Sequence, residues 1–286
     1  MTAIEAAIRA RRRQAIVTRT GAGVLLAICL IVAAIVSEAD PARIVAGAPR
    51  VGVYLSKLVP DLRPAVLFDG TQTEGSLAFW MYRLDLWLWL LFETSQMAAL
   101  ATLLGSTLGL LLCWPAAANL APHRFVYLAA RRTLEMLRSV PEIVYALILV
   151  WTFGVGPLAG ILAIALHTSG ALGKLFAEAA ENADMRAWDA MTAAGATWLQ
   201  SVRFAILPQV LPNILSYVLL RFEINVRGAT VIGFVGAGGI GQELYTVISF
   251  NYHQEIGAIV VLIVLAVSLI DLVSERLRRR AIGVTV

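Results

Sequence analysis

The chain has 286 residues, of which 59% are hydrophobic and 15% charged, and its mean hydropathy is +0.78. Soluble domains are about 45–50% apolar and about 25% charged, so this composition excludes an ordinary water-facing fold. The formal charge is +4, but the basic residues flank apolar runs and form no stripe between aromatic residues, so no nucleic-acid partner is predicted. The predicted surroundings are a lipid bilayer.

Six apolar runs approach the roughly 20 residues that a membrane-spanning helix needs. They are Gly21–Val36, Thr94–Ala117, Val140–Trp151, Val155–Leu175, Val210–Phe222 and Ile256–Val273. The predicted fold is therefore all-α, a polytopic membrane protein with about six transmembrane helices. A secretory signal is an alternative for the first run, but no small-x-small cleavage pattern follows that run.

Most of the 23 Lys and Arg residues lie in segments that share one side of the membrane if both termini are cytoplasmic. Cytoplasmic loops are enriched in Lys and Arg, so this orientation is predicted. The chain then divides into a basic cytoplasmic N-terminus (1–20), a first transmembrane helix (21–37), an external segment (38–92), a transmembrane domain (93–275) and a cytoplasmic C-terminus (276–286).

Aromatic residues crowd the end of the external segment: Phe79, Trp80, Tyr82, Trp87 and Trp89. Trp and Tyr are enriched at the level of the lipid headgroups. The pattern predicts a helix over Leu77–Phe92 that lies on the outer membrane surface.

One string resembles an enzyme signature, because Gly236–Gly241 fits the dinucleotide pattern G-x-G-x-x-G and follows the strand-like Val231–Val235. A dinucleotide site also needs a βαβ unit and an acidic residue about 20 positions later. An apolar run follows instead, and the nearest acids are Glu243 and Glu255. The glycines are interpreted as a helix break or as a close approach of two backbones within the membrane.

Other catalytic signatures are absent. In the phosphate-binding pattern G-x-x-x-x-G-K-[ST], Thr168 and Leu175 stand at the first and last positions. The candidate metal ligands and nucleophiles are scattered: His123, His167, His253, Cys29 and Cys113. No catalytic residue, metal site or bound cofactor is predicted, and His167 is interpreted as a packed or water-facing helix residue.

A long polar stretch, Glu178–Gln209, falls on the predicted cytoplasmic side. Its larger apolar residues and one glycine recur at steps of three and four, which predicts one face of a helical segment: Trp188, Met191, Gly195, Trp198, Leu199 and Val202. The stretch has few basic residues to hold acidic lipid headgroups. Docking onto a soluble partner is therefore the preferred interpretation.

Within this stretch, Asp189-Ala190-Met191, Gly195 and Leu207-Pro208 resemble the E-A-A-x-x-x-G-(nine residues)-I-x-L-P loop of ABC importer permeases, with Asp189, Met191 and Ala205 as departures. Further strings are similar to phosphonate-family permeases: Glu93–Ala98, Arg138–Glu142, Phe176–Asn182, Pro208–Pro212 and Phe222–Gly241. The resemblance covers about Glu93 to Asp271.

The resemblance implies a permease domain over 93–275 that carries phosphonate or a related oxyanion such as phosphate across a bacterial inner membrane. The implied partners are a second permease copy in a homodimer, two cytoplasmic ATPase subunits that hold ATP and Mg, and an external solute-binding protein. The loop would form coupling helices against the ATPase. Asp189 would offer a carboxylate to a basic residue, and Pro208 would start the fifth span. Gly195 would permit a bend, or alternatively close helix packing.

Four polar residues stand in or near the fifth run: Arg221, Glu223, Asn225 and Arg227. Such residues are costly in lipid and usually pair or face a cavity. Glu223 and Arg227 are four apart and could neutralise each other, while Arg221 and Asn225 share another face and could donate to an oxyanion. With two arginines and one glutamate, the segment keeps a net positive charge unless Glu93 or Glu142 reaches it. Gln96 is a further candidate for the pathway.

Two rival functions remain open from the sequence. One is an importer permease for amino acids such as methionine, whose coupling loop would look similar. The other is a membrane-embedded enzyme, for which no nucleophile, acid–base pair or metal cluster is visible.

Overall fold

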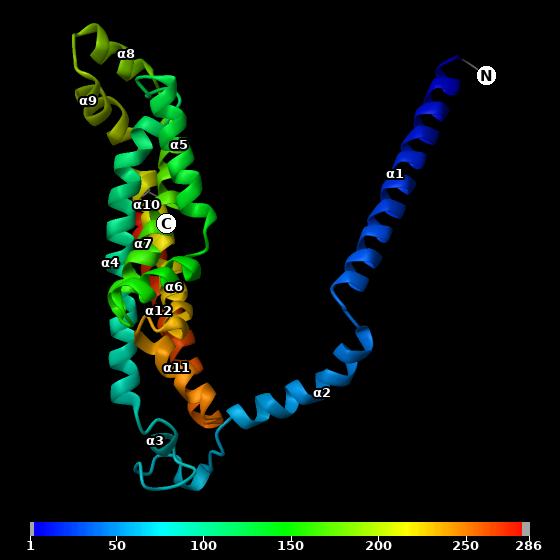
Figure 1. The fold of residues 1–286 in the computed structure, drawn as a ribbon, viewed down its shortest axis with the longest axis vertical. Coiled ribbons are helices and arrows are strands. Elements are labelled where there is room, and N and C mark those ends of the chain that lie inside the picture. Colours follow the sequence, from blue (N-terminus) through cyan, green and yellow to red (C-terminus); the bar gives the residue numbers. More distant parts are fainter. Residues whose placement is uncertain (1–2, 282–286) are drawn as a thin grey trace. The chain divides into compact units, whose positions relative to one another are not determined.

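The computed structural model describes residues 3–281, a range that contains helices and no strand. The predicted cytoplasmic ends include residues 1–2 and 282–286, which lie outside the described residues. Figure 1 shows the helices, which are α1 (Ala3–Val36), α2 (Pro41–Leu58), α3 (Leu77–Trp80), α4 (Leu84–Ala116), α5 (Arg124–Ser139), α6 (Glu142–Phe153), α7 (Pro157–Glu181), α8 (Arg186–Ala193), α9 (Trp198–Ser201), α10 (Leu207–Ile232), α11 (Gly239–Ser249) and α12 (His253–Ala281).

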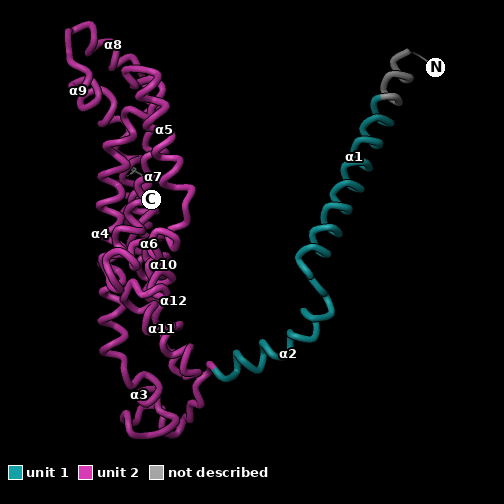
Figure 2. The backbone as a smooth tube through the Cα atoms, in the orientation of Figure 1, with its two compact units in different colours: residues 1–57 teal, residues 58–286 magenta. Residues whose placement is uncertain are grey.

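Two compact units divide the chain, one of residues 1–57 and one of residues 58–286 (Figure 2). In the first unit, α1 contains the apolar segment Arg11–Val36 of 26 residues. At about 1.5 Å per residue this segment is about 39 Å long, enough to cross a bilayer. Its helix begins earlier than the predicted span at Gly21. Apolar side chains such as Leu25 and Ile35 are exposed, as lipid contact requires.

Within residues 3–281, five helices are long and apolar enough to cross a membrane, or six if the bent pair α5 and α6 forms one span. This agrees with the predicted fold class. The third predicted span, Val140–Trp151, is not a full span by itself, because α6 has 12 residues and is only about 18 Å long. Helices α5 and α6 meet at 85°.

The bend between α5 and α6 follows from Pro141. The residue before a proline avoids the helical region, and Val140 is extended with ψ of 122°. Helix α5 therefore ends at Ser139, and α6 restarts at Glu142. The hydroxyl of Tyr145 donates to the carbonyl of Leu137 at 3.2 Å and ties the two helices together.

Helices α4 and α7 pack side by side through small residues (Figure 1). A Cβ atom on Gly109 would lie 2.9 Å from the backbone nitrogen of Gly173, and one on Gly105 would lie 2.7 Å from Cβ of Thr168. Small residues allow such close backbone approach in membrane proteins. The contact brings the Thr168 side chain against α4.

The predicted surface helix over Leu77–Phe92 is wrong in its second part. Helix α3 ends at Trp80, and Leu84–Phe92 is the first part of the 33-residue helix α4. Trp87, expected at the headgroup level, is fully buried against Ile240 and Ile259. Packing against α11 and α12 therefore determines its position.

The glycine-rich stretch both breaks a helix and allows close packing. Helix α10 ends at Ile232, and Gly236 and Gly238 have φ of 89° and 88°, values that favour glycine. The strand-like residues Val231–Val235 are instead the end of α10 and a 3-10 turn. A Cβ atom on Gly241 would overlap the carbonyl oxygen of Thr230. The interpretation made from the sequence is confirmed.

We expect Gly241→Ala to destabilise the protein, because the added methyl group meets a backbone carbonyl that cannot rotate away. Overpacking of this kind costs about 1–3 kcal/mol. The thermal unfolding midpoint in detergent should fall by several degrees. Gly52→Ala is the matched control, because Gly52 lies in helix α2 with open space around it. An unchanged midpoint for Gly241→Ala would contradict this packing.

Candidate functional site

The predicted apolar docking face of the loop faces the protein's own core in large part. Trp188 and Met191 of α8 pack against the buried cluster around Phe176 and Ile206, and Val202 is buried. Trp198 donates from Nε1 to the carbonyl of Leu120 at 2.7 Å. The steps of three and four residues therefore mark the face through which the loop packs against the helix bundle. Leu199 is 68% exposed and remains available to a partner.

The outer surface of α8 carries the matched loop residues. Asp189 and Ala190 are exposed, and the Asp189 carboxylate makes no hydrogen bond or ion pair with residues of the described range. Leu207 and Pro208 follow directly on the π-helical turn Val202–Ile206, so the helical span is continuous from Trp198 and does not start at Pro208 as expected. The side chain of Leu207 packs against the cluster around Phe176.

Gly195 lies between α8 and α9 with φ of 82°, and no atom lies within 4 Å of the position of its Cβ. Close helix packing is therefore excluded as the reason for glycine, and the left-handed backbone is the reason. Beyond the turn, Thr197 and Gln200 form a capping box that starts α9.

The start of α8 is held by charged and amide groups. The Arg186 guanidinium donates hydrogen bonds to both carboxylate oxygens of Asp184 and lowers the pKa of that carboxyl below its ordinary value. Gln209 on α10 accepts from the backbone nitrogen of Asp184 at 2.9 Å and donates to its carbonyl at 3.1 Å. The loop is thus a fixed structure anchored to α10.

We expect Gly195→Val to disturb this loop, because a β-branched residue at positive φ is a strong outlier. The strain should be about 1–3 kcal/mol and should lower co-purification of the ATPase subunit that the family resemblance implies. Gly195→Asn should be close to the natural protein, since asparagine tolerates the left-handed region. Equal recovery of the ATPase with both variants would contradict the importance of this turn.

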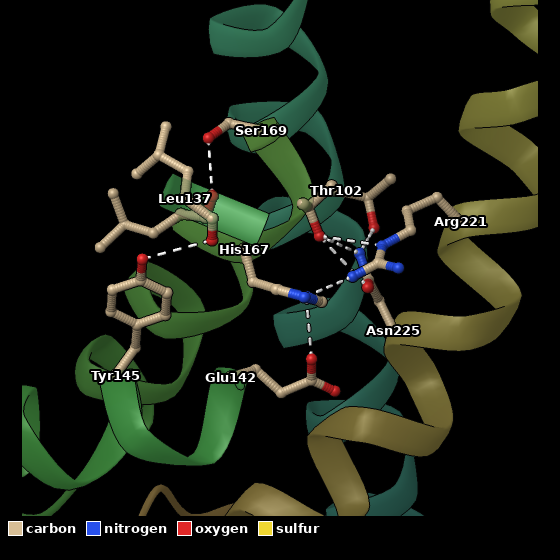
Figure 3. A network of polar contacts seen from close by, with 10 residues as sticks. Thr102, Leu137, Glu142, Tyr145, His167, Ser169, Arg221 and Asn225 are labelled. Atoms are coloured by element: carbon tan, nitrogen blue, oxygen red, sulfur yellow. Dashed lines mark hydrogen bonds and ion pairs between the residues drawn. The ribbon is translucent and has the colours of Figure 1, made fainter. Parts of the chain in front are cut away.

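A polar network joins four helices within the bundle (Figure 3). Its members are Thr102 of α4, Glu142 of α6, His167 and Thr168 of α7, and Arg221 and Asn225 of α10. Arg221 and Asn225, predicted to share a helix face, both contact Thr168. The close packing of α4 on α7 and the bend before α6 bring the other members to them.

The buried half of the network is fully hydrogen-bonded. Asn225 donates from Nδ2 to the hydroxyl oxygens of Thr102 at 2.8 Å and Thr168 at 3.0 Å. The Thr168 hydroxyl donates to Oδ1 of Asn225 at 3.2 Å, and the Thr102 hydroxyl donates to the carbonyl of Ala98 at 2.6 Å. Such satisfied networks fix side-chain positions.

The charged half of the network is centred on one imidazole nitrogen. Nδ1 of His167 lies 2.7 Å from Nη2 of Arg221 and 2.9 Å from Oε2 of Glu142. The Arg221 Nε donates to the Thr168 hydroxyl at 3.3 Å. The remaining terminal nitrogen, Nη1, donates to none of the described residues. Gly228 leaves room for the carboxylate, since a Cβ there would lie 3.1 Å from Oε1 of Glu142.

Glu223 and Arg227 do not form the ion pair that their spacing allows. Arg227 is half exposed and donates to Asp271 of α12 at 2.9 Å, while buried Glu223 lies 3.9 Å from Arg278. Arg221 also has an opposite charge nearby, because Glu142 lies beside His167 and Arg221. Each of the three charged residues of α10 therefore has an oppositely charged neighbour. Glu142 therefore reaches the segment, which is the exception that the sequence allowed, and no net positive charge remains along α10.

Gln96 lies apart from the network. It is exposed and lines a separate cavity of about 580 Å³ together with Glu93, Met97 and Leu100. In the glycine-rich turn, the Gly236 N–H group donates to Gly233 and the Ile240 N–H group donates to Thr94, so neither group is available to a ligand.

Sequence reasoning missed His167, Thr168 and Thr102 as partners of Arg221 and Asn225. The available signal was the adjacent pair His167-Thr168 in an apolar run, since buried polar side chains need partners. Among residues 3–281, no group of three His, Cys, Asp or Glu side chains could hold a metal ion.

Comparison with known proteins gives a family and its relatives. Residues 101–281 match the model of the family described as binding-protein-dependent transport system inner membrane component. A phosphite transport system permease protein of Stutzerimonas stutzeri is 42% identical over 193 residues, which are 68% of this chain and 70% of that protein. A shorter Escherichia coli K12 protein, described as a cryptic phosphonate transport system permease protein, is 46% identical over 122 residues, which are 43% of this chain and 100% of that protein.

Among solved structures, the inward-facing methionine ABC transporter MetNI has a similar fold, with a TM-score of 0.61, 23% identity, and coverage of 70% of this chain and 97% of that chain. The family match spans more than half of the chain, and its members are membrane components of transport systems. The chain therefore belongs to the binding-protein-dependent transport system inner membrane component family, as a multi-pass permease subunit and not an enzyme.

Proposed function

We propose that the chain is the permease subunit of an ATP-driven importer of phosphorus oxyanions, namely phosphonate, phosphite or phosphate. The observation that carries this proposal is the half-buried Arg221 guanidinium, which is held by Thr168 and His167 and keeps Nη1 free to donate. Arginine suits phosphorus oxyanions because its planar guanidinium can donate N–H groups in a fork geometry to two oxygens of the anion. The names of the relatives at 42% and 46% identity support the same substrate class.

The proposed complex contains a second copy of this chain, two ATPase subunits with ATP and Mg, and an external solute-binding protein. The anchored loop α8–α9 would sit on the ATPase through Asp189, Ala190 and Leu199, which are exposed. The loop packs on the cluster that includes Ile206, the residue before α10, and Val210 of α10. ATPase movement would therefore reach the network helix α10 directly, as a rigid element with two positions.

We further propose that the network lies near the cytoplasmic boundary of the membrane. Glu223 lies beside Arg278, in the basic end of α12, and Arg138 packs on Gly170, two residues after Thr168. Basic residues concentrate at the cytoplasmic side. A guanidinium near this boundary is less costly than one at the bilayer centre.

The proposed orientation, with both termini cytoplasmic, has a direct test in a background without Cys29 and Cys113. In intact cells, Thr20→Cys and Val284→Cys should resist a membrane-impermeant thiol reagent, whereas Asp69→Cys should react. Labelling of Val284→Cys from outside would reverse the orientation.

The substrate class is tested by substrate-stimulated ATP hydrolysis of the reconstituted complex. We expect stimulation by the binding protein loaded with phosphite, phosphate or methylphosphonate, and none with methionine. A methionine importer is the rival function, but the solved methionine transporter is only 23% identical, which supports the fold alone. Stimulation by methionine and by no phosphorus anion would transfer the proposal to that rival.

A further inference from the structure

One nitrogen of His167 lies beside two partners, of which one can only donate a hydrogen bond and the other accepts one. Nδ1 lies 2.7 Å from Nη2 of Arg221, which can only donate, and 2.9 Å from Oε2 of Glu142, which accepts when ionised. A neutral ring nitrogen either carries a proton and donates or has a lone pair and accepts. Nδ1 can therefore satisfy Arg221 or Glu142 at one time, but not both.

The two arrangements differ in what Arg221 can bind. When Nδ1 accepts from Arg221, the guanidinium is held in the network. When Nδ1 carries a proton, it donates to Glu142, and its N–H group opposes the N–H group of Arg221. The guanidinium then has both terminal nitrogens free for an external acceptor, while its Nε remains on Thr168 at 3.3 Å.

The surroundings give the imidazole access to water and to an anion. His167 also lines an open cavity of about 370 Å³ together with Glu135, Arg138 and Ser139 of the α5 end. Glu135 is paired with Arg132, whereas exposed Arg138 makes no ion pair or hydrogen bond through its side chain with the described residues. The titratable groups around His167 are thus Glu142 on α6, Arg221 on α10, and Glu135 and Arg138 on α5.

Charge balance favours proton uptake when an anion arrives. Ionised Glu142 and Arg221 with neutral His167 are together uncharged. Of the outer groups, Glu135 is neutralised by Arg132, and the charge of Arg138 is screened by water because this side chain is exposed. If Arg221 binds a singly charged oxyanion, one negative charge is added to a half-buried site, which is unfavourable. A proton on the imidazole restores neutrality and gives Glu142 a new donor. Histidine is the side chain that gains and loses protons near neutral pH.

We propose that His167 is a proton-linked latch: when Nδ1 binds a proton from the solvent, its N–H group donates a hydrogen bond to ionised Glu142, and Arg221 is released to a phosphorus oxyanion. The proposal rests on the proposed function, because it assumes that Arg221 receives the transported anion. His167 acts through Arg221 and is a positioning residue. Loss of the anion returns the proton to water and re-forms the contact between Nδ1 and Arg221.

The test counts the protons taken up per bound anion. Phosphite is titrated into the purified permease–ATPase complex at neutral pH, in two buffers with different ionisation enthalpies, and the difference in heat gives the proton number. The natural complex should take up about one proton more per anion than His167→Asn, since linkage follows the change in bound protons. Ionisation of phosphite itself is common to both complexes and cancels.

Two further variants keep the test decisive. Glu142→Gln removes the carboxylate that stabilises the protonated ring, so its proton number should match that of His167→Asn, even if one variant assembles poorly. His123→Asn, at an exposed histidine before α5, should keep the natural value.

Equal proton numbers in the natural, His167→Asn and Glu142→Gln complexes would overturn the latch. So would absence of phosphite binding by a natural complex that transports phosphite in vesicles. Failure of that transport measurement would instead refute the proposed function, so the two failures are distinguishable.

Discussion

Uptake of phosphorus oxyanions should fall at least about tenfold when Arg221 is replaced by Gln. Hydrogen bonds that involve a charged group are worth about 1.5–3 kcal/mol, and each 1.4 kcal/mol corresponds to about a tenfold change. Arg221 is the network cation, and its Nε and Nη2 atoms are held by Thr168 and His167. Initial uptake rates in vesicles that contain the whole complex measure the effect.

The matched control is Arg227→Gln. Arg227 has a side chain that is 52% exposed and forms an ion pair with Asp271. Exposed ion pairs contribute about 0–1 kcal/mol, so uptake should remain within about twofold. Co-purification of the ATPase establishes that each complex assembles, and the double variant Arg221→Gln with Glu142→Gln avoids an unpaired carboxylate. Unchanged uptake in an assembled Arg221→Gln complex would remove Arg221 from the anion's path.

Replacing Asp189 with Lys should abolish most ATPase association and therefore uptake. The carboxylate is exposed on α8 and has no partner within the described residues, so it is free for a basic group of the ATPase. Reversing its charge replaces an attraction by a repulsion, which lowers affinity by several kcal/mol at a close interface. The measurement is the ratio of ATPase to permease after affinity purification.

Asp189→Glu provides a matched control, because it restores the residue of the family loop and keeps the charge. We expect that variant to retain the ATPase, and Asp189→Asn to lie between Glu and Lys. The insertion of the spans should be the same in all four proteins. Retention of the ATPase by Asp189→Lys would remove Asp189 from the interface.

Composition and periodicity were sufficient for the fold class because long apolar helices have a strong local signal. The bilayer requires runs such as Ile256–Val273, and α12 covers this run. Breaks were harder to predict. The predicted third span, Val140–Trp151, begins just before Pro141, whereas in the structure α6 starts at Glu142 and is bent by 85° from α5.

The site could be predicted only on one helix at a time. Arg221 and Asn225 share a face because they are four residues apart, which depends on helix geometry alone. Their partners on α4, α6 and α7 depend on which helices approach closely, and that depends on Gly105 and on the bend before Glu142. The same limit explains the pairing of Arg227 with Asp271 rather than with its neighbour Glu223.

The amphipathic loop shows a second limit of periodicity. Spacing identified an apolar face on α8 correctly, but it does not state what covers that face. In the structure, Trp188 and Met191 cover the chain's own core. The exposed polar face, with Asp189, is therefore the surface available to a partner.

ATP-driven uptake in proteoliposomes tests the central claim most directly. The chain is reconstituted with its ATPase and binding protein, and the accumulation of labelled phosphite, phosphate, methylphosphonate and methionine is followed with and without ATP. We expect ATP-dependent accumulation of at least one phosphorus oxyanion and none of methionine. Accumulation of methionine alone, or no accumulation of any phosphorus oxyanion by an assembled complex that hydrolyses ATP, would contradict the account.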